Sequence, residues 1–352
     1  MERNLDLTFM AMYDTLIANN QADILLLQHN NPYAIVLERQ IFSEAIENGT
    51  LDVKCETEFK GIEAFLSKRK IQKFIGKNTA NWILNRTVLM NYLKDAKGAK
   101  KRPIVLFLNS VFTEIRYPVD ALLHLKKEYG AIFILYYIDT ISRGVSLYAN
   151  YLREKGVFDL IYTFDKDDAY KYELMFWETP YSKMRLNISN KFDLYFCGVD
   201  TDRIETIRTI SRVPELDYSM DLIGVSGNGV FEENNRIILH SVKDVMPYKV
   251  VLEKTLEANC ILEIVRPGQV GFTLRAFEAV VYNKKLLTNN KRITEFPFYN
   301  SKYMRVFKKV EDIDWKWVKL KDKVDYHYDG SFSPLKFIEE ISNKACQIKG
   351  IR

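Results

Sequence analysis

The sequence contains few of the residues that build metal centres and disulfide frameworks. Its four cysteines and four histidines are scattered over 352 residues. No CxxC pair and no HExxH motif occurs, so the sequence offers neither a zinc-ligand pattern nor a set of closely spaced disulfides. Widely separated cysteines are typical of free thiols in a reducing cytoplasm.

Long apolar segments are also missing. The longest strongly apolar run, residues 131–138, is far too short to span a bilayer. The first residues include acids and no long apolar core, so we expect no signal peptide. A cytoplasmic location is therefore predicted.

Several familiar catalytic and nucleotide-binding motifs are absent. There is no GxSxG elbow, no GxxxxGK[ST] loop and no GxGxxG, of which Gly227-Asn228-Gly229 is only a fragment. The composition, 47% hydrophobic and 28% charged over 352 residues, is that of an ordinary globular protein long enough for two cores. The net charge of +5 permits attraction to phosphates or to an anionic membrane without requiring either.

Strands and helices alternate through the first half. Apolar runs predict strands at residues 24–27, 104–108, 131–138 and 159–164. Helical spacing predicts helices at residues 35–48, 58–74, 80–94, 117–129 and 142–155. Alternation of this kind favours a parallel, doubly wound sheet. In such sheets ligands bind beyond the carboxyl ends of the strands.

Three polar residues that follow these strands are candidates for a general base. Asp139 is the first candidate, with His29 and Asp165 behind it. A lone histidine in a loop more often makes a structural hydrogen bond, and Asp165 is well placed to cap the next helix. Asp165 and Asp167 also match the Asp-x-Asp spacing of metal-dependent transferases, but Lys166 and the helix start favour a cap. We expect no metal.

The second half repeats the alternation after a linker at residues 173–191. We expect a first domain at residues 1–178 and a second at residues 179–352. Strands are predicted at residues 192–198, 220–226, 236–239, 261–265, 286–288 and 303–307. Helices are predicted at residues 201–210, 248–258 and 335–348. Gly198 is expected to turn the chain, either where donor and acceptor meet or simply at a strand end. The alternating Trp315 and Trp317 are expected to serve in packing.

Residues 260–290 form a strand, a glycine-bearing loop, a helix and a strand, which is a βαβ unit. Gly268 and Gly271 lie in the loop, and Thr273 is a plausible cap of the helix. Backbone N–H groups at such a helix start favour an anion, and Arg266 adds a cation to the same loop.

One face of this helix carries a cation and an acid three residues apart. Arg275 for phosphate and Glu278 for ribose hydroxyls would suit a nucleoside diphosphate. The alternative is that the two side chains pair with each other on a solvated helix face, where such pairs stabilise weakly.

Two segments of the βαβ unit carry a family resemblance. Residues 271–279, GFTLRAFEA, and residues 283–290, NKKLLTNN, resemble the donor-binding segment of GT-B glycosyltransferases, in particular bacterial enzymes of lipopolysaccharide-core and capsular-polysaccharide synthesis. Residues 136–139, 162–172 and 192–200 resemble the same group. The resemblance implies an α/β, GT-B fold: two Rossmann-like, doubly wound domains facing across a cleft, with a terminal helix that often crosses back to the first domain. It places the ribose on Glu278.

The resemblance also implies the activity. It implies transfer of a sugar from a nucleotide-sugar donor, expected to be a UDP-sugar, without the help of a metal. The expected acceptor is a glycan or lipid-linked molecule of cell-surface polysaccharide synthesis. Many retaining members carry a glutamate where this chain has Val270, so the stereochemistry stays open. Basic residues at 68–73 and 94–102 fit contact with an anionic membrane, or simply solvated surface.

Three other functions remain to be weighed. A catalytically silent glycan-binding subunit would share the fold and release no nucleotide. A GT-B-type nucleotide-sugar epimerase would turn over the donor without an acceptor. A nucleic-acid partner is not expected, because the net charge is modest and no recognised module is present.

Overall fold

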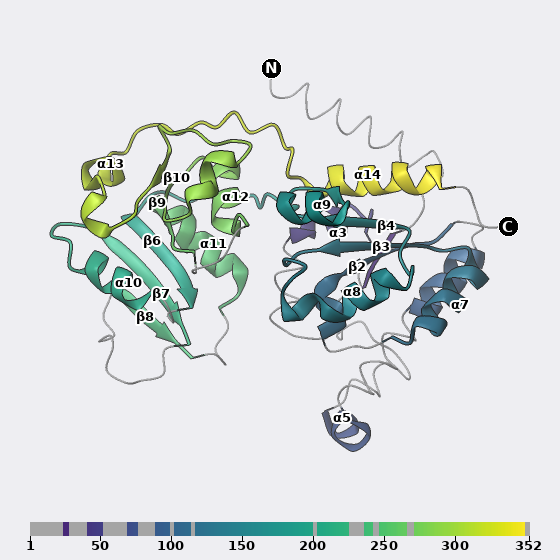
Figure 1. Ribbon diagram of the computed structural model, residues 1–352. Helices are drawn as coiled ribbons and strands as arrows, with labels where there is room; N and C mark the ends of the chain where they lie inside the picture. The colour runs from purple at the N-terminus through teal and green to yellow at the C-terminus, as the bar shows by residue number, and fades with distance from the viewer. Residues whose placement is uncertain are drawn as a thin grey trace. The chain divides into compact units, whose positions relative to one another are not determined.

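The computed structural model describes residues 24–27, 41–51, 69–76, 89–98, 102–113, 117–199, 203–224, 236–241, 246–265 and 271–348. The chain forms two compact units, residues 1–182 with 332–352 and residues 183–331. The sequence-based boundary falls at residues 178/179 and leaves the last helix in the second domain. Each unit is a parallel sheet flanked by helices (Figure 1). The predicted α/β fold of two Rossmann-like units is confirmed.

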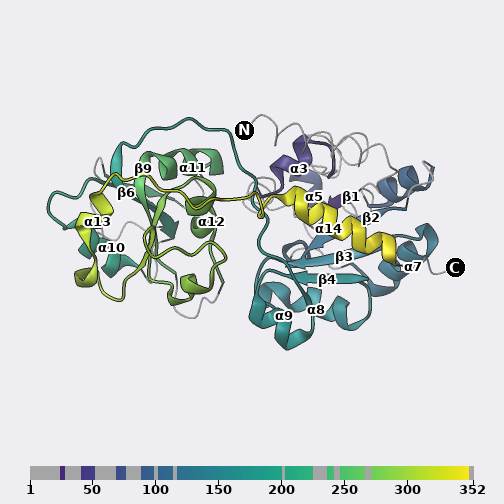
Figure 2. The same ribbon diagram turned by 90° about the horizontal axis from the view of Figure 1, so that it is seen from above.

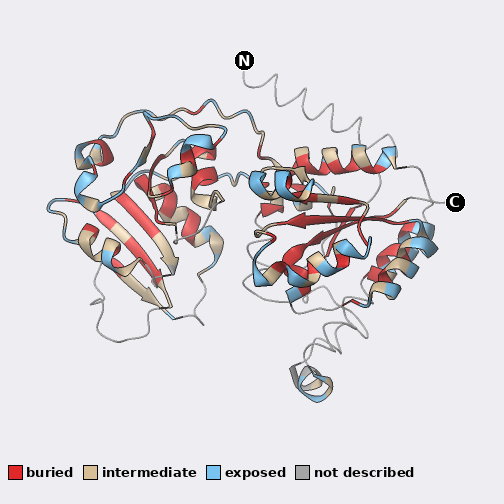
Figure 3. Cartoon of the chain, viewed as in Figure 1, coloured by how far each residue is buried: buried red, intermediate tan, exposed pale blue. Residues whose placement is uncertain are grey.

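The first unit contains a five-stranded parallel sheet in the order β1-β2-β3-β4-β5. Its strands are β1 (Ile24–Leu27), β2 (Ile104–Leu108), β3 (Ile132–Tyr137), β4 (Leu160–Thr163) and β5 (Met175–Phe176). The first three are buried at every position (Figure 3). A strand covered on both faces needs apolar side chains on both, which explains the continuous apolar runs in the sequence. β5 lies in the predicted linker and pairs with β4 through Met175 and Phe176.

Helices cover both faces of this sheet (Figure 2). One face carries α7 (Val119–Tyr129), α8 (Leu147–Glu154) and helical residues 89–98. The other carries α3 (Ser43–Glu47) and α14 (Pro334–Gln347). Phe337 of α14 is fully buried. Its ring centroid lies 4.9 Å from that of Tyr136, 5.5 Å from that of Tyr162 and 5.5 Å from that of Trp177. The last helix of the chain therefore completes the first core.

The two chain segments that leave the first unit are bonded to each other and to the start of α3. Tyr181 N–H donates to the Phe332 carbonyl at 2.7 Å. The Ser182 hydroxyl donates to the Ile41 carbonyl at 2.7 Å, and the Ser333 hydroxyl donates to Glu44 at 2.8 Å. These bonds fix both exits on one side of the first unit.

The second unit contains a six-stranded parallel sheet in the order β11-β10-β9-β6-β7-β8. Its strands are β6 (Phe192–Val199), β7 (Tyr218–Ile223), β8 (Ile237–His240), β9 (Ala258–Glu263), β10 (Lys285–Thr288) and β11 (Met304–Val306). The chain runs outward from β6 to β8, then returns to β9 and runs outward the other way. The strand order therefore reverses between β6 and β9. The described strands of the first unit, in contrast, follow chain order.

Two layers of helices enclose the second sheet. One face packs on α10 (Ile204–Ser211) and α13 (Trp315–Lys319). The other faces α11 (Tyr248–Glu257) and α12 (Leu274–Val281). Trp317 is 6% exposed within the first of these cores and Trp315 packs against it, so the predicted packing role of both tryptophans is confirmed.

Candidate functional site

The reversal of strand order marks the carboxyl ends of β6 and β9 as the binding edge of the second sheet. At such a switch point the connections leave neighbouring strands in opposite directions and open a crevice between them. Gly198 lies at the carboxyl end of β6, and the loop that leads to α12 follows β9. Tertiary structure thus brings Gly198 and the residues around Gly271 and Thr273 to one edge.

Gly198 does not turn the chain, so that prediction is wrong. It lies inside β6, in register with Leu222 of β7. A Cβ atom at this position would lie 2.7 Å from Nη1 of Arg203 and 3.0 Å from the ring of Phe196. A side chain at this position would therefore make the ends of the Arg203 and Phe196 side chains shift. Its predicted part in donor binding stays a prediction.

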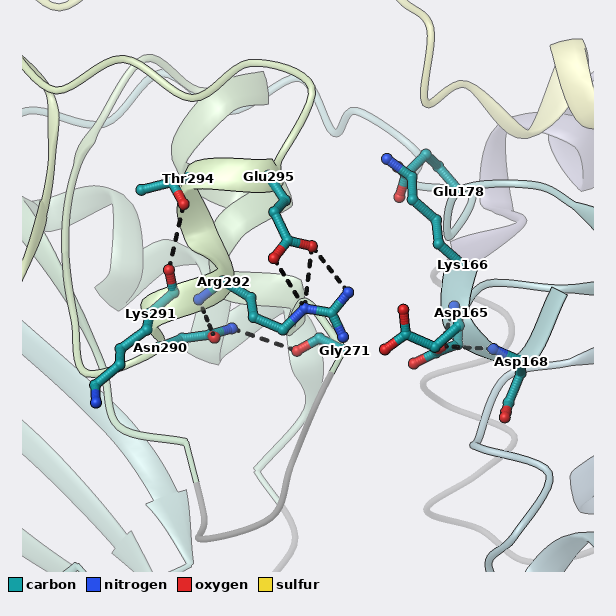
Figure 4. Close-up of polar contacts among 11 residues, drawn as sticks. Asp165, Lys166, Asp168, Glu178, Gly271, Asn290, Lys291, Arg292, Thr294 and Glu295 are labelled. Carbon is teal, nitrogen blue, oxygen red and sulfur yellow. Dashed lines mark hydrogen bonds and ion pairs between the residues drawn. The ribbon is translucent and has the colours of Figure 1, made fainter. Parts of the chain in front are cut away.

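Two consecutive asparagines after β10 hold both ends of the loop between β9 and α12. The Asn289 side chain accepts from Val265 N–H at 2.7 Å and donates to the Val265 carbonyl at 3.2 Å. The Asn290 amide donates to the Gly271 carbonyl at 3.4 Å (Figure 4). The predicted loop residues Arg266 and Gly268 lie outside the described residues. The residues on either side of this loop, Val265 and Gly271, are hydrogen bonded to the side chains of Asn289 and Asn290, which follow β10.

The predicted cap of α12 is confirmed. Thr273 Oγ1 accepts from Arg275 N–H at 3.2 Å and donates to Glu263 Oε1 at 2.5 Å. The Thr288 hydroxyl donates to the other oxygen of Glu263. Burial raises the pKa of Glu263, which is 2% exposed, while the two threonine hydroxyls oppose that shift. Glu263 of β9 therefore links the start of α12 to β9 and β10. The sequence did not reveal this role, because Glu263 lies in an apolar run.

Arg275 and Glu278 do pair with each other, but on a buried face. Arg275 Nη1 lies 2.5 Å from Glu278 Oε2, and the Tyr248 hydroxyl donates to Oε1 at 2.6 Å. Glu278 has no exposed surface, and the Arg275 side chain keeps 16%. The expectation of a solvated pair is wrong, because α11 covers this face of α12: Arg275 also donates to Thr255 on α11 at 3.2 Å.

The pairing constrains the chemistry of both residues. Burial would lower the pKa of Arg275, but the Glu278 carboxylate holds it above its ordinary value, so the guanidinium stays charged. Both oxygens of Glu278 already accept hydrogen bonds. Because Glu278 has no exposed surface, a ribose can reach it only if groups that cover it move aside.

A second buried acid, Asp221 on β7, was not singled out from the sequence. It is 0% exposed and accepts from the Tyr195 hydroxyl at 2.7 Å and from Lys254 Nζ at 2.8 and 2.9 Å. His240 Nε2 lies 2.7 Å from its Oδ1. Burial alone would raise the pKa of Asp221, but hydrogen bonds from Lys254, His240 and Tyr195 lower it. The sequence signal that could have revealed Asp221 is a single acid within an otherwise apolar strand.

The candidate bases of the first unit differ in how they are used. Asp165 accepts from Asp167 N–H at 2.9 Å and Asp168 N–H at 3.0 Å, which confirms the predicted cap of α9 (Lys166–Tyr172) (Figure 4). Asp139 forms a partly exposed ion pair with Arg143 at 2.9 Å. His29 lies outside the described residues. Asp139 and Asp165 follow neighbouring strands, as predicted, and their catalytic roles stay predictions.

Glu178, in the predicted linker, lies at the same edge of the first sheet. It follows β5, and Lys166 Nζ lies 3.8 Å from its Oε1 (Figure 4). Oε1 is buried and accepts no hydrogen bond from the part of the chain that the structure describes. Burial raises the pKa of Glu178 to about 7, against the opposing effect of Lys166.

Neither a metal cluster nor a membrane span is found among the described residues. No group of three or more His, Cys, Asp or Glu side chains is placed there to hold a metal ion. No helix in the described ranges is long and apolar enough to cross a bilayer. The Asp-x-Asp spacing at residues 165–167 serves the cap of α9.

The chain resembles several solved glycosyltransferases at low identity. The calicheamicin glycosyltransferase CalG4 is 10% identical over 93% of this chain and 99% of its own, with a TM-score of 0.38. T4 phage β-glucosyltransferase is 13% identical over 92% and 94%, with a TM-score of 0.40. A glycosyltransferase from Rickettsia africae is 10% identical over 94% and 100%, with a TM-score of 0.44. No family model and no curated protein matches the sequence.

Proposed function

We propose that this chain is a GT-B-type glycosyltransferase that binds a nucleotide-sugar donor at the carboxyl edge of its second sheet. The observation that carries the proposal is the loop between β9 and α12. It lies at the reversal of strand order, both its ends are fixed by Asn289 and Asn290, and it leads into a capped helix start at Thr273. Backbone N–H groups at a helix start, with the dipole behind them, suit a diphosphate.

The proposed donor contacts are of two kinds, neutral backbone groups and charged side chains. Gly268, Gly271 and Thr273 offer backbone N–H groups to the diphosphate. The Arg275 charge is balanced by Glu278, so Arg266 is the cation that offsets the charge developing on the leaving group. Ribose binding at Glu278 requires that groups covering this buried side chain move, and Tyr248, whose hydroxyl donates to Oε1, is one of its neighbours.

The finer assignments follow the resemblance in the sequence. They are a UDP-sugar donor, a glycan or lipid-linked acceptor of cell-surface polysaccharide synthesis held by the first unit, and no requirement for a metal. The modest net charge and the scattered cysteines add two further expectations, no nucleic-acid partner and a cytoplasmic location. Peripheral contact with an anionic membrane is supported by α5 (Arg69–Ile75), on which Phe74 is 88% exposed beside the exposed Lys73. Domain limits at residues 1–178 and 179–352 remain the sequence-based proposal.

A thermal-shift panel of nucleotide sugars, run with and without EDTA, tests donor binding. A ligand that binds only the folded chain raises the melting temperature, and we expect one nucleotide family to do so regardless of EDTA. Nucleotide release with lipid-linked glycans, free glycans and DNA as acceptors then tests transfer. Binding without release would favour the silent subunit, and donor turnover without acceptor would favour the epimerase. No shift with any nucleotide sugar, with or without an acceptor present, would contradict the proposal.

A further inference from the structure

Two partly buried carboxylates of the described ranges, Glu178 and Asp322, keep a buried oxygen without a hydrogen-bond partner, and the Asp322 oxygen is closely paired with Lys285 at 2.6 Å. Asp165, Asp221, Glu263 and Glu278 are the fully buried acids of the described ranges, and each accepts from at least two groups. The oxygens of these carboxylates therefore already have partners within the protein. The Glu178 side chain is only 16% exposed, yet its Oε1 accepts no hydrogen bond from any described residue. An orphaned buried polar atom costs stability and calls for a functional reason.

The surroundings of Glu178 place it where a ligand is expected. It directly follows β5, at the carboxyl edge of the parallel sheet of the first unit, beside the start of α9. Lys166 Nζ lies 3.8 Å from Oε1 and 5.2 Å from the ring centroid of Phe176. At 3.8 Å the lysine supplies charge without a hydrogen bond. No described residue therefore donates a hydrogen bond to this oxygen.

We infer that Glu178 is the proton acceptor in glycosyl transfer, taking the hydroxyl proton of an acceptor bound at this edge. The inference rests on the proposed transferase function. As the carboxylate takes the proton, the acceptor oxygen forms its bond to the anomeric carbon of the donor sugar. The bond from that carbon to the phosphate oxygen breaks, and the nucleoside diphosphate leaves with the electron pair. Glu178 then returns the proton to water. Such a displacement inverts the anomeric centre.

The acid–base properties of the site support this role. Burial raises the pKa of Glu178 to about 7, where a general base is both ionised and basic enough to accept a proton at neutral pH. Two titratable groups from neighbouring elements face it. Lys166 on α9 favours the carboxylate, and Tyr136 on β3 donates to the Glu178 carbonyl at 3.4 Å. Burial raises the pKa of Tyr136 well above its ordinary value, so Tyr136 stays neutral.

The test compares nucleotide release by the unmodified chain and by three variants, Glu178→Gln, Lys166→Met and Glu173→Gln. Glu173 is an exposed glutamate on the same segment, so its substitution serves as the matched control. We expect Glu178→Gln to lower kcat/KM by about 10²–10⁴-fold and to keep the donor-induced thermal shift. The unmodified chain should gain activity as pH rises through about 7. Lys166→Met should move that inflection to higher pH, because the lysine lowers the pKa of Glu178.

Each alternative outcome has a definite meaning. Activity of Glu178→Gln within twofold of Glu173→Gln would overturn the inference and leave the transferase proposal standing. So would an inflection that Lys166→Met does not move, or retention at the anomeric carbon by product NMR. Absence of turnover in the unmodified chain with every donor and acceptor would overturn the transferase function itself, and the inference with it.

Discussion

Replacing Glu178 by glutamine is expected to stabilise the first unit at alkaline pH. At pH 8 the native carboxylate is charged and largely buried, and none of the residues that the structure describes donates a hydrogen bond to Oε1. Burying a charge that lacks partners is unfavourable. Glutamine has nearly the same shape and stays neutral at every pH, so the variant escapes this cost.

The magnitude follows from the pKa. Burial raises the pKa of Glu178 from its ordinary 4.5 to about 7, and each pH unit corresponds to about 1.4 kcal/mol, so the full effect is about 3.5 kcal/mol. The folded protein binds this proton more tightly than the unfolded chain does. The stabilisation from the protonated form is therefore complete below pH 4.5 and is lost as the pH rises through about 7. The glutamine variant shows no such loss.

Thermal denaturation at pH 5 and pH 8 measures the difference. In a unit of this size about 1 kcal/mol shifts the melting temperature by about 2–4 °C. About 2.5 kcal/mol of the effect falls between pH 5 and pH 8, so the melting temperature of Glu178→Gln should gain about 5–10 °C on that of the unmodified chain over this range. The exposed Glu173→Gln control should follow the unmodified chain. Identical pH dependence of all three proteins would refute the reasoning, as would a Glu178→Gln variant that is less stable at pH 8.

Two further substitutions test the second unit. Asp221→Asn removes the charged partner of Lys254 and should lower the free energy of unfolding by about 3–5 kcal/mol in chemical denaturation. The exposed Asp217→Asn should lower it little. An equal effect of the two substitutions would contradict the buried network. The pKa of Asp221 is lowered, so its stabilisation is present above the ordinary 3.8 and lost as the pH falls through the folded value. Asn290→Ala removes the hydrogen bond to Gly271 at the loop and the cap of the 3-10 helix Lys291–Glu295. It should weaken donor binding about tenfold by calorimetry, while the exposed Asn300→Ala should leave it unchanged. Equal affinities would argue against a donor loop there.

Local signals in the sequence predicted the elements well where one strand or one turn decides the outcome. The strands at residues 104–108 and 24–27 were found because strands buried on both faces must be continuously apolar. The caps at Asp165 and Thr273 were found because a cap needs only residues two or three positions away. β5 was missed because its two residues form a strand only by pairing with β4.

The candidate site was predictable in part. The βαβ unit at residues 260–290 gave the loop, the helix and the position of Thr273. It did not show that Asn289 and Asn290 fix the loop, because their partners Val265 and Gly271 lie about twenty residues away. The helical spacing of Arg275 and Glu278 predicted that they share a face. Which layer covers that face depends on α11, which lies elsewhere in the sequence.

By itself, the sequence determined the alternation of strands and helices, the glycine-bearing loop and the two helix caps, because hydrophobic periodicity and capping act over a few residues. Only the tertiary structure decided where strand order reverses, which acids are buried, and which of them have partners. Burial and hydrogen bonding depend on groups far apart in the chain. Glu178 lies in a segment with no regular pattern, and only its place after β5 and beside Lys166 of α9 makes it a largely buried carboxylate.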